Sequence, residues 1–502
     1  MSSARGRVWL VGAGPGDPGL LTRKAERAIA ACEVLVYDYL ASPAIVALAP
    51  PQCEKIYVGK RAGDHALAQS DITELIVRLG REGKRVVRLK GGDVFVFARG
   101  GEEAAALHAA GVPFEIVPGI SSALAAPAYA GIPITHRDHN SAFTVATGHE
   151  DPAKTASALD FAKLADPGQT LVFLMAMANL PHIIAELRTR GMPADLPVAI
   201  IREGTKPAQQ TLVATLDTIV AAVERAAFSA PAVVVIGTVV REREALRWFD
   251  TNPLFGKRVL VTRAREAAVE FAERLWEAGA EPVLAPTIAI GPPDDPGPAR
   301  SAVAQLGSYQ WVTFTSANGA NACFGLLREA GADARRFGAA NVAAIGPATA
   351  KALAGFGVRA DFVPSAYVAE DVAAGLIERT APGDRVLLFG AQTMRAALPE
   401  LLRAASRTVD VVAGYKTTRI VDAAIADAAR EADVWTFTSA STVEGFVASV
   451  PDAAQLRGRT IVACIGPVTA EAARSAGLAP DVVATDATVE GLLEALELAH
   501  AP

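Results

Sequence analysis

Short apolar runs alternate with amphipathic stretches along almost the whole chain. Four runs dense in β-branched residues predict buried strands, at Val8–Val11, Val34–Tyr37, Val86–Leu89 and Phe114–Val117. A helix is predicted between the second and third of these, where one apolar face is formed by Ile72, Leu75, Ile76 and Leu79. Alternation of this kind predicts an α/β fold with mostly parallel sheets and helices on both faces.

The pattern breaks most clearly between Arg241 and Gly256. A charged, helix-like segment runs there into the breakers at Asp250–Pro253, and a new strand follows. The break predicts two parts, residues 1–248 and 255–502.

The second part contains an internal duplication. Three motif pairs recur in it: FTSA at 314 and 437, IGPxTA at 345 and 465, and GKRVLVTRA at 256 with GDRVLLFGA at 383. The offsets are 437 − 314 = 123, 465 − 345 = 120 and 383 − 256 = 127. Offsets this similar predict two α/β lobes, and a cleft between two lobes is where ligands usually bind.

Composition narrows the classes of function. The 502 residues are 51% hydrophobic and 20% charged, with a net charge of −6 and no long basic run, which argues against nucleic acid as a partner. No apolar run approaches the roughly 20 residues of a membrane span, and the N-terminus lacks a signal-peptide core. The four cysteines form no C-x-x-C pair, so a reducing cytoplasm is expected rather than a zinc site or a disulfide framework.

A glycine-rich turn, Gly12–Gly19, follows the first predicted strand. It matches a dinucleotide-binding loop poorly, because Asp17 stands where glycine is required and Pro15 and Pro18 remove backbone donors. An oxidoreductase is therefore the weakest of the functions considered.

Charged residues are dense around the Gly91-Gly92 step, where glycines let a ligand approach the backbone closely. Either this is a tight turn with a solvated charged face, or it is an anion site, which the charge density favours. His136 and His139 are three residues apart but have no cysteine or carboxylate cluster beside them, so no metal is expected.

These segments together resemble the uroporphyrinogen-III C-methyltransferase family, over about residues 6–247. The resemblance rests on VGAGPGDPGLLT, RLKGGD, RGGEE, VPGIS and AYAGIPITHR. It implies a homodimer of two α/β domains per subunit, with S-adenosyl-L-methionine bound between the two domains. It also implies cofactor contacts at Pro15, Gly91, Gly92, Asp93, Val96, Ser121, Ser122, Met175 and Gly204.

The same resemblance implies a proton acceptor at Asp38 and a proton donor at Lys60. These residue types suit the chemistry, because a methylated pyrrole must lose a proton and a carboxylate can accept it. The acidic side chains of the substrate would pair with Arg61, Arg88, Lys90, Arg99 and Arg137. The chain departs from the family pattern at Tyr39, Val94 and Ala98. These departures bear on substrate binding and on the pocket for the adenine of the cofactor.

The second part carries paired hydroxyl residues at predicted strand ends and helix starts: Ser316, Thr349, Ser439 and Thr469. Taken singly they are explained by helix capping. Taken as pairs across two lobes, they would line a cleft with neutral donors for a polycarboxylate.

The order of these motifs, with the Gly-Tyr-Lys-Thr segment around Tyr415, resembles the uroporphyrinogen-III synthase family over about residues 255–497. That family is bilobal, with paired linkers between the lobes. The resemblance implies cyclisation of hydroxymethylbilane with inversion of ring D. It points to Tyr415 for assisting departure of the hydroxyl and to Thr349, Ser439 and Thr469 as binders.

The leading hypothesis is a bifunctional enzyme that forms uroporphyrinogen III and methylates it twice, at C2 and C7, to give precorrin-2. One alternative keeps the methyltransferase and makes the second part a non-catalytic tetrapyrrole-binding module. Another is a methyltransferase for a later corrin precursor. The sequence leaves open whether the pathway ends in siroheme, cobalamin or another tetrapyrrole.

Overall fold

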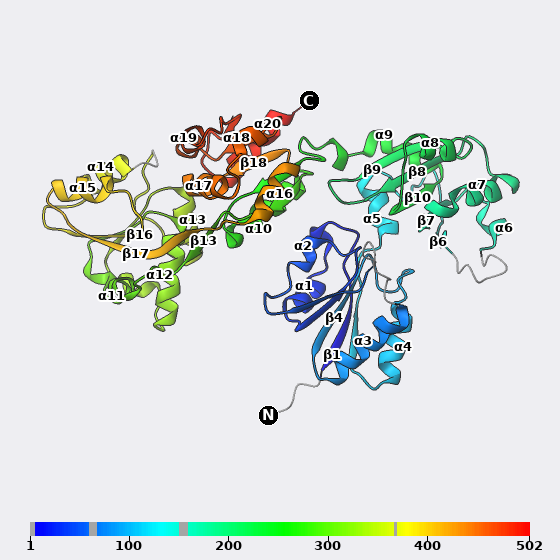
Figure 1. The fold of residues 1–502 in the computed structure, drawn as a ribbon, viewed down its shortest axis with the longest axis horizontal. Coiled ribbons are helices and arrows are strands. Elements are labelled where there is room, and N and C mark those ends of the chain that lie inside the picture. The colour runs from blue at the N-terminus through cyan, green and yellow to red at the C-terminus, as the bar shows by residue number, and fades with distance from the viewer. Residues whose placement is uncertain (1–5, 60–67, 150–158, 366–368, 502) are drawn as a thin grey trace. The chain divides into compact units, whose positions relative to one another are not determined.

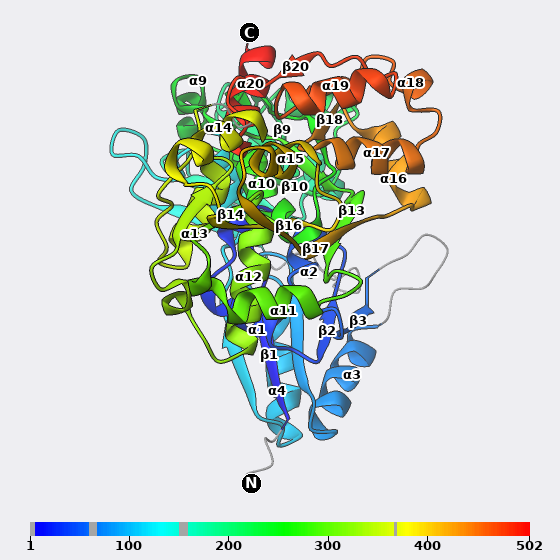
Figure 2. The same cartoon turned by 90° about the vertical axis from the view of Figure 1, so that its left-hand side faces the viewer.

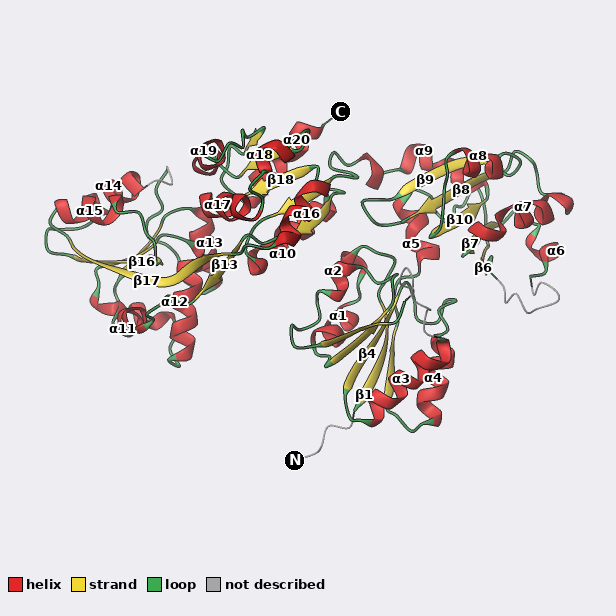
Figure 3. Ribbon diagram, in the orientation of Figure 1, coloured by secondary structure: helices red, strands yellow, loops and turns green. Residues whose placement is uncertain are grey.

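The computed structural model describes residues 6–59, 68–149, 159–365 and 369–501. The contacts divide the chain into two compact units. The first unit comprises residues 1–257, 273–281 and 500–502, and the second comprises 258–272 and 282–499. Helices and strands alternate through both units, and the described residues form four five-stranded sheets (Figure 3).

The first sheet is parallel, in the strand order β3-β2-β4-β1-β5. Its strands are β1 (Arg7–Gly12), β2 (Val34–Tyr37), β3 (Glu54–Tyr57), β4 (Arg85–Lys90) and β5 (Phe114–Val117). One face is covered by α1 (Arg23–Ala30) and α2 (Pro43–Val46), the other by α3 (Gln69–Arg81) and α4 (Gly100–Ala109) (Figure 1). The four predicted strands and the predicted helix are confirmed.

The second sheet departs from the expectation of parallel pairing. Its order is β6-β7-β10-β8-β9, and only β6 and β7 pair parallel. The strands are β6 (Phe143–Thr147), β7 (Thr170–Leu174), β8 (Pro197–Arg202), β9 (Gln210–Thr215) and β10 (Ala232–Ile236). The prediction was wrong here for two reasons. Strands β8 and β9 are joined by the connection 203–209, which permits antiparallel pairing, whereas parallel neighbours need a longer crossover connection. Strand β10 then inserts between β7 and β8 and runs antiparallel to both.

Helices again cover both faces of this second sheet. Helix α5 (Ser122–Tyr129) packs on one face, against alternate side chains of β7, β8 and β10. The opposite face is covered by α6 (Phe161–Leu164), α7 (Leu180–Thr189) and α8 (Ile219–Arg225).

The predicted break near residue 250 is a packed segment. After α9 (Arg243–Leu246), Trp248 donates a hydrogen bond from Nε1 to the carbonyl of Ala128 at 3.1 Å. The ring of Tyr129 lies 5.0 Å from Trp248 and 4.9 Å from Phe249. The segment is therefore fastened to the end of α5.

The second unit contains two sheets with matching strand orders. The strand order in lobe A is β12 (Glu281–Leu284), β11 (Arg258–Val261), β18 (Val434–Phe437), β19 (Ile461–Cys464) and β20 (Val482–Val483). In lobe B the order is β13 (Ile288–Gly291), β17 (Thr408–Arg419), β16 (Arg385–Ala391), β14 (Trp311–Phe314) and β15 (Asn341–Ala344). The duplication is confirmed, because β11, β18 and β19 correspond to β16, β14 and β15.

Equivalent strands lead into equivalent helices. Strands β14 and β18 precede α12 (Ala317–Glu329) and α17 (Ala440–Ser449), while β15 and β19 precede α13 (Pro347–Gly355) and α19 (Pro467–Ser475). Figure 2 shows α11 (Gly297–Ala304) and α12 on one side of the lobe B sheet, with α14 (Ala369–Arg379) and α15 (Ala397–Ala404) on the other. Lobe A is completed by α10 (Arg265–Glu277), α16 (Ala423–Glu431), α18 (Ala453–Leu456) and α20 (Val489–His500).

Two linkers join the lobes, after β12 and after β17. They are paired, because the backbone NH of Ile420 donates to the carbonyl of Thr287 at 2.9 Å. The buried hydroxyl of Thr287 donates to the carbonyls of Thr262 and Thr442, at 3.2 and 3.0 Å. Among the described residues, no helix is long and apolar enough to cross a membrane.

Candidate functional site

The loops at the carboxyl edge of the first sheet meet through their glycines. Gly14 and Gly92 exchange backbone hydrogen bonds of 3.2 and 2.7 Å. A Cβ on Gly119 would lie 2.3 Å from the carbonyl oxygen of Gly92, and a Cβ on Gly91 would lie 2.5 Å from Cβ of Leu40. Larger residues would therefore push these loops apart.

Asp93 fixes the turn after β4. Its Oδ1 accepts from the NH of Phe95 at 2.8 Å and its Oδ2 accepts from the NH of Gly119 at 3.1 Å. Ser121 and Ser122 lie beside Gly92, at the start of α5. Five of the predicted cofactor contacts, Gly91, Gly92, Asp93, Ser121 and Ser122, are thus brought together.

The loop that carries Pro15 is joined to the second sheet. Asp17 donates its backbone NH to the hydroxyl of Thr205 at 3.2 Å, and its carboxylate accepts from the hydroxyl of Tyr129 at 2.6 Å. Burial raises the pKa of Asp17, whereas the hydrogen bond from Tyr129 lowers it. Gly204 touches α5, because a Cβ there would lie 2.5 Å from Cβ of Ala126.

Two predicted cofactor residues have exposed apolar side chains. Val96 lies in the turn between β4 and α4, and Met175 follows β7 with a left-handed φ of 55°. Because both side chains are apolar and exposed, both are accessible to a ligand.

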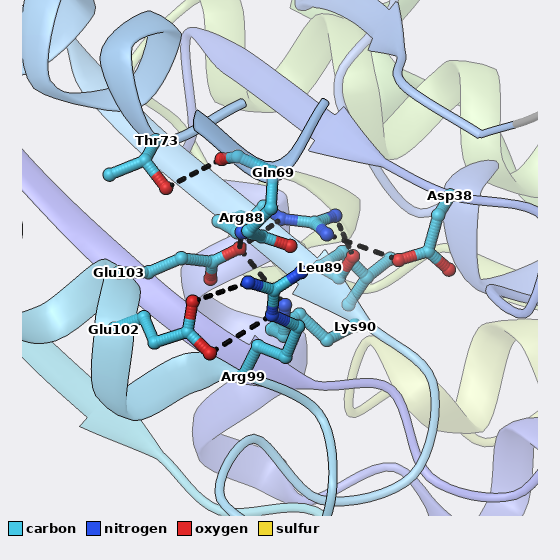
Figure 4. A network of polar contacts seen from close by, with 9 residues as sticks. All are labelled: Asp38, Gln69, Thr73, Arg88, Leu89, Lys90, Arg99, Glu102 and Glu103. Atoms are coloured by element: carbon cyan, nitrogen blue, oxygen red, sulfur yellow. Dashed lines mark hydrogen bonds and ion pairs between the residues drawn. The ribbon is translucent and has the colours of Figure 1, made fainter. Parts of the chain in front are cut away.

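Asp38 lies at the partly exposed end of a network of charges that includes Arg88 and Lys90 of β4 and the buried Glu103 (Figure 4). Its Oδ2 accepts from Nη2 of Arg88 at 3.2 Å. Arg88 Nε and Lys90 Nζ donate to Oε1 of Glu103 at 3.3 and 3.0 Å. Gln69 donates to the same oxygen at 2.9 Å. The carboxylate of Glu103 is completely buried, and its Oε2 has no hydrogen-bond partner among the described residues.

The two cations and two carboxylates of this network balance. Burial lowers the pKa of Lys90, and the charge of Arg88 lowers it further, while Glu103 raises it. Arg88 and Lys90 were expected to bind substrate, yet their guanidinium and ammonium groups are held by Glu103 and Asp38. In this arrangement Arg88 orients Asp38, and Lys90 is held by Glu103. A direct contact of either cation with substrate stays a prediction.

The remaining predicted substrate residues lie at the surface or outside the described ranges. Arg99 is exposed and pairs with Glu102 through bonds of 2.9 and 2.7 Å. Arg137 is also exposed. Lys60 and Arg61 lie outside the described residues. Within the described ranges, no group of three or more His, Cys, Asp or Glu residues is placed to hold a metal ion.

In the second unit, the structure brings Tyr415 and Ser316 together. Tyr415 lies on β17, 8% exposed, and its hydroxyl is 3.0 Å from the hydroxyl of Ser316. Ser316 caps α12 by accepting from the NH of Gly319 at 3.0 Å. This pairing joins a sheet residue to the first turn of a helix within lobe B.

A cavity of about 850 Å³ is lined by residues of both lobes. Its lining includes Tyr415 from lobe B and Thr438, Ser439 and Arg263 from lobe A. Ser439 caps α17 through a capping box with Thr442. The predicted binders Thr349 and Thr469 are buried within the first turns of α13 and α19 and are not among the cavity residues.

Sequence reasoning missed two residues of these sites. Glu103 is the last residue of the RGGEE motif, but its burial depends on which face of α4 packs against the sheet. Arg263 could have been found through the duplication, because the equivalent residue in the second copy is Gly390, with 390 − 263 = 127.

Both units match known families. Residues 7–220 match the tetrapyrrole (corrin/porphyrin) methylases, and residues 269–494 match uroporphyrinogen-III synthase HemD. The S-adenosyl-L-methionine-dependent uroporphyrinogen III methyltransferase of Methanosarcina barkeri is 51% identical over 246 residues, covering 49% of this chain and 96% of its own. A solved structure of uroporphyrin III C-methyl transferase from Thermus thermophilus is 38% identical, covers 47% of this chain and 99% of its own, and has a TM-score of 0.41.

One relative spans both units. Porphyrin biosynthesis protein HemD of Ruminiclostridium josui is 39% identical over 497 residues, which is 98% of this chain and 97% of its own length. With a tetrapyrrole methylase match in the first unit and a uroporphyrinogen-III synthase match in the second, the chain belongs to the HemD family of porphyrin biosynthesis proteins.

Proposed function

We propose that the chain is a bifunctional enzyme of tetrapyrrole biosynthesis. The second unit cyclises hydroxymethylbilane to uroporphyrinogen III with inversion of ring D. The first unit methylates that product at C2 and C7 with S-adenosyl-L-methionine and releases precorrin-2. The observation that carries the proposal is the relative matched over 98% of the chain, through both family regions.

The glycine turn of the first unit fits S-adenosyl-L-methionine. Gly92 has a φ of +67°, and a Cβ there would come no closer than 3.9 Å to any neighbouring atom, which leaves room for a ligand against the backbone. The exposed apolar side chains of Val96 and Met175 supply contact surface. The turn with Ser121 and Ser122 would hold the cofactor, which supplies an electrophilic methyl group on a sulfonium sulfur.

The residues of the first unit act on the substrate by alignment and by proton removal. Holding the pyrrole carbon in line with the methyl group provides much of the acceleration. Asp38 then accepts the proton that the methylated ring must lose. Arg88 holds Oδ2 of Asp38 at 3.2 Å, so the carboxylate is fixed before substrate arrives.

The residues of the second unit act by shaping an open-chain substrate. The Tyr415 hydroxyl, supported by Ser316, is placed to assist departure of the substrate hydroxyl. Ser439 and Thr438 offer neutral donors from the opposite lobe. A cavity of about 850 Å³ restricts the reactive chain to conformations in which the substituted carbon of ring D is attacked.

The test is a coupled assay with the full chain, hydroxymethylbilane and S-adenosyl-L-methionine. The expected product is a dimethylated, reduced tetrapyrrole of the type III isomer. Formation of only the uncatalysed ring-closure isomer would refute the synthase activity. Accumulation of unmethylated uroporphyrinogen III would refute the methyltransferase activity.

Three further expectations remain predictions. The first is the division of the chain into two separately active domains, residues 1–248 and 255–502. The homodimer through the first unit can be checked by analytical ultracentrifugation. Placement in the cytoplasm can be checked by fractionation of the source cells.

A further inference from the structure

Arg263 is a half-buried cation with no partner at the cavity of the second unit. It follows β11 and lines the cavity, and no hydrogen bond or ion pair joins its guanidinium to another residue in the described part of the chain. Two carboxylates act on it electrostatically, Glu270 and Glu490. Both lie 3.8 Å from the ammonium of Lys351 instead.

Such a position is unfavourable for an unpaired charge. Burial lowers the pKa of Arg263, and the fields of Glu270 and Glu490 only partly offset this. A desolvated cation without a counter-ion costs free energy, which a bound anion recovers. The second arginine of the cavity, Arg300, differs because it has Glu329 at 3.8 Å.

The duplicated lobes differ at this position. Lobe B has Gly390 where lobe A has Arg263, and a Cβ on Gly390 would lie 2.0 Å from Oγ1 of Thr315. No side chain is accommodated there, so the symmetric cation is absent. Lobe B instead contributes the hydroxyls of Tyr415 and Ser316. The cavity is therefore asymmetric: lobe A contributes Arg263, a cation without an ion-pair partner among the described residues, and lobe B has no equivalent of it at Gly390.

We propose that Arg263 binds a carboxylate of the open-chain tetrapyrrole in the second unit, and so sets which end of the chain reaches Tyr415. The inference rests on the proposed synthase function. Arginine suits the role, because its planar guanidinium forms two parallel hydrogen bonds with one carboxylate. An acidic side chain anchored on lobe A leaves the reacting hydroxymethyl end free to approach the hydroxyls of lobe B.

The experiment compares three variants of the full chain: Arg263→Gln, Arg263→Lys and the control Arg265→Gln. Arg265 is the exposed first residue of α10. Its change to Gln removes the same charge as Arg263→Gln, two residues further along the chain. For Arg263→Gln the KM for hydroxymethylbilane should rise by about 10- to 100-fold, the worth of a hydrogen bond to a charged group. The kcat should change much less, and the Lys variant should recover part of the loss.

Salt dependence separates ligand binding from a structural role. Increasing NaCl should raise the KM of the wild type and of Arg265→Gln, but hardly that of Arg263→Gln, because screening acts on an ion pair that this variant lacks. Loss of the anchor should also increase the share of the type I isomer. An Arg263→Gln protein with wild-type KM, salt dependence and isomer ratio would overturn the inference while leaving the synthase function intact.

A binding measurement keeps the inference testable if turnover fails. Uroporphyrin III, a stable polycarboxylate, is titrated into each variant and its fluorescence followed at two ionic strengths. Arg263→Gln should bind uroporphyrin III more weakly than Arg265→Gln does. If the wild type does not convert hydroxymethylbilane, the proposed function fails, whereas equal titrations for both variants would overturn the Arg263 site alone.

Discussion

The two units handle buried positive charge in opposite ways. In the first unit, Arg88 and Lys90 are neutralised by Glu103 and Asp38 within the protein. In the second unit, the half-buried Arg263 lines a cavity, and no ion pair or hydrogen bond joins its guanidinium to another of the described residues. The difference matches the roles proposed for the two sites: Asp38 as a proton acceptor that is held in place before substrate arrives, and Arg263 as a cation whose counter-ion is a carboxylate of the substrate. Breaking a buried charge pair is costly, so a single substitution at Glu103 should destabilise the first unit. In the second unit, a single substitution of Arg263 should instead weaken substrate binding.

The largest effect is expected for Asp38→Asn. Methylation of uroporphyrinogen III should fall by about 10²- to 10⁴-fold, because the amide cannot accept the proton. Cyclisation of hydroxymethylbilane should keep its wild-type rate, since Asp38 lies in the first unit. Separate assays of the two half-reactions give the result, and a parallel loss of cyclisation would contradict the independence of the two units.

The next effect concerns Glu103→Gln, which removes the shared acceptor of Arg88 and Lys90. Stability of the first unit should drop by about 3–5 kcal/mol, the typical cost of breaking a buried charge pair. The control is Glu102→Gln. The Glu102 side chain is 56% exposed and pairs with the exposed Arg99, so the cost should stay below about 1 kcal/mol. Urea unfolding of both variants tests this, and equal losses would mean that burial of Glu103 is unimportant.

The loss of stability in Glu103→Gln should also depend on pH. In the wild type the pKa of Lys90 is already lowered by burial, and Glu103 opposes that shift. Without the carboxylate it should fall further below its value in the unfolded chain. In the folded variant, Lys90 is buried without its carboxylate, so folding is disfavoured while Lys90 is charged. The loss of stability of Glu103→Gln relative to the wild type should therefore shrink as pH rises above the pKa of Lys90 in the folded variant. A deficit that is constant between neutral and alkaline pH would contradict this account.

A moderate effect is expected for Tyr415→Phe. Loss of the hydroxyl next to Ser316 should slow cyclisation by about tenfold, since a hydrogen bond between neutral groups typically contributes about 1 kcal/mol. Methylation of supplied uroporphyrinogen III should be unchanged. Stopped-assay analysis of product isomers provides the measurement, and an unchanged cyclisation rate would remove Tyr415 from the mechanism.

The smallest effect compares two helix caps. Ser439 caps α17 beside the cavity, whereas Asp422 caps α16 and is not among the cavity residues. Each change to Ala should cost about 1 kcal/mol of stability. Only Ser439→Ala should also raise the KM for hydroxymethylbilane. If both variants raise it equally, Ser439 acts through helix stability and not as a donor to substrate.

The sequence predicted well wherever local rules decide the outcome. Strand runs, the turn at Gly91 and Gly92 and the duplication all follow from neighbouring residues. Successive helix positions differ by about 100° around the axis, so Glu102 and Glu103 point to different environments. Which of them is buried depends on packing of α4 against the sheet. The antiparallel second sheet likewise depends on where β10 inserts, which no local pattern encodes.

The paired linkers of the second unit have a consequence for the order of folding. Lobe B is one continuous stretch inserted into lobe A, whose strand β11 pairs with β18 at Val259 and Val434, a separation of 434 − 259 = 175 residues. During synthesis β11 emerges long before its partner, and closing so long a loop is slow and entropically costly. Lobe B can complete its sheet first and bring the two linkers together at Thr287 and Ile420. A polypeptide truncated after residue 430 would therefore retain a complete lobe B sheet but leave β11, which still has β12 on one side, without β18 on the other.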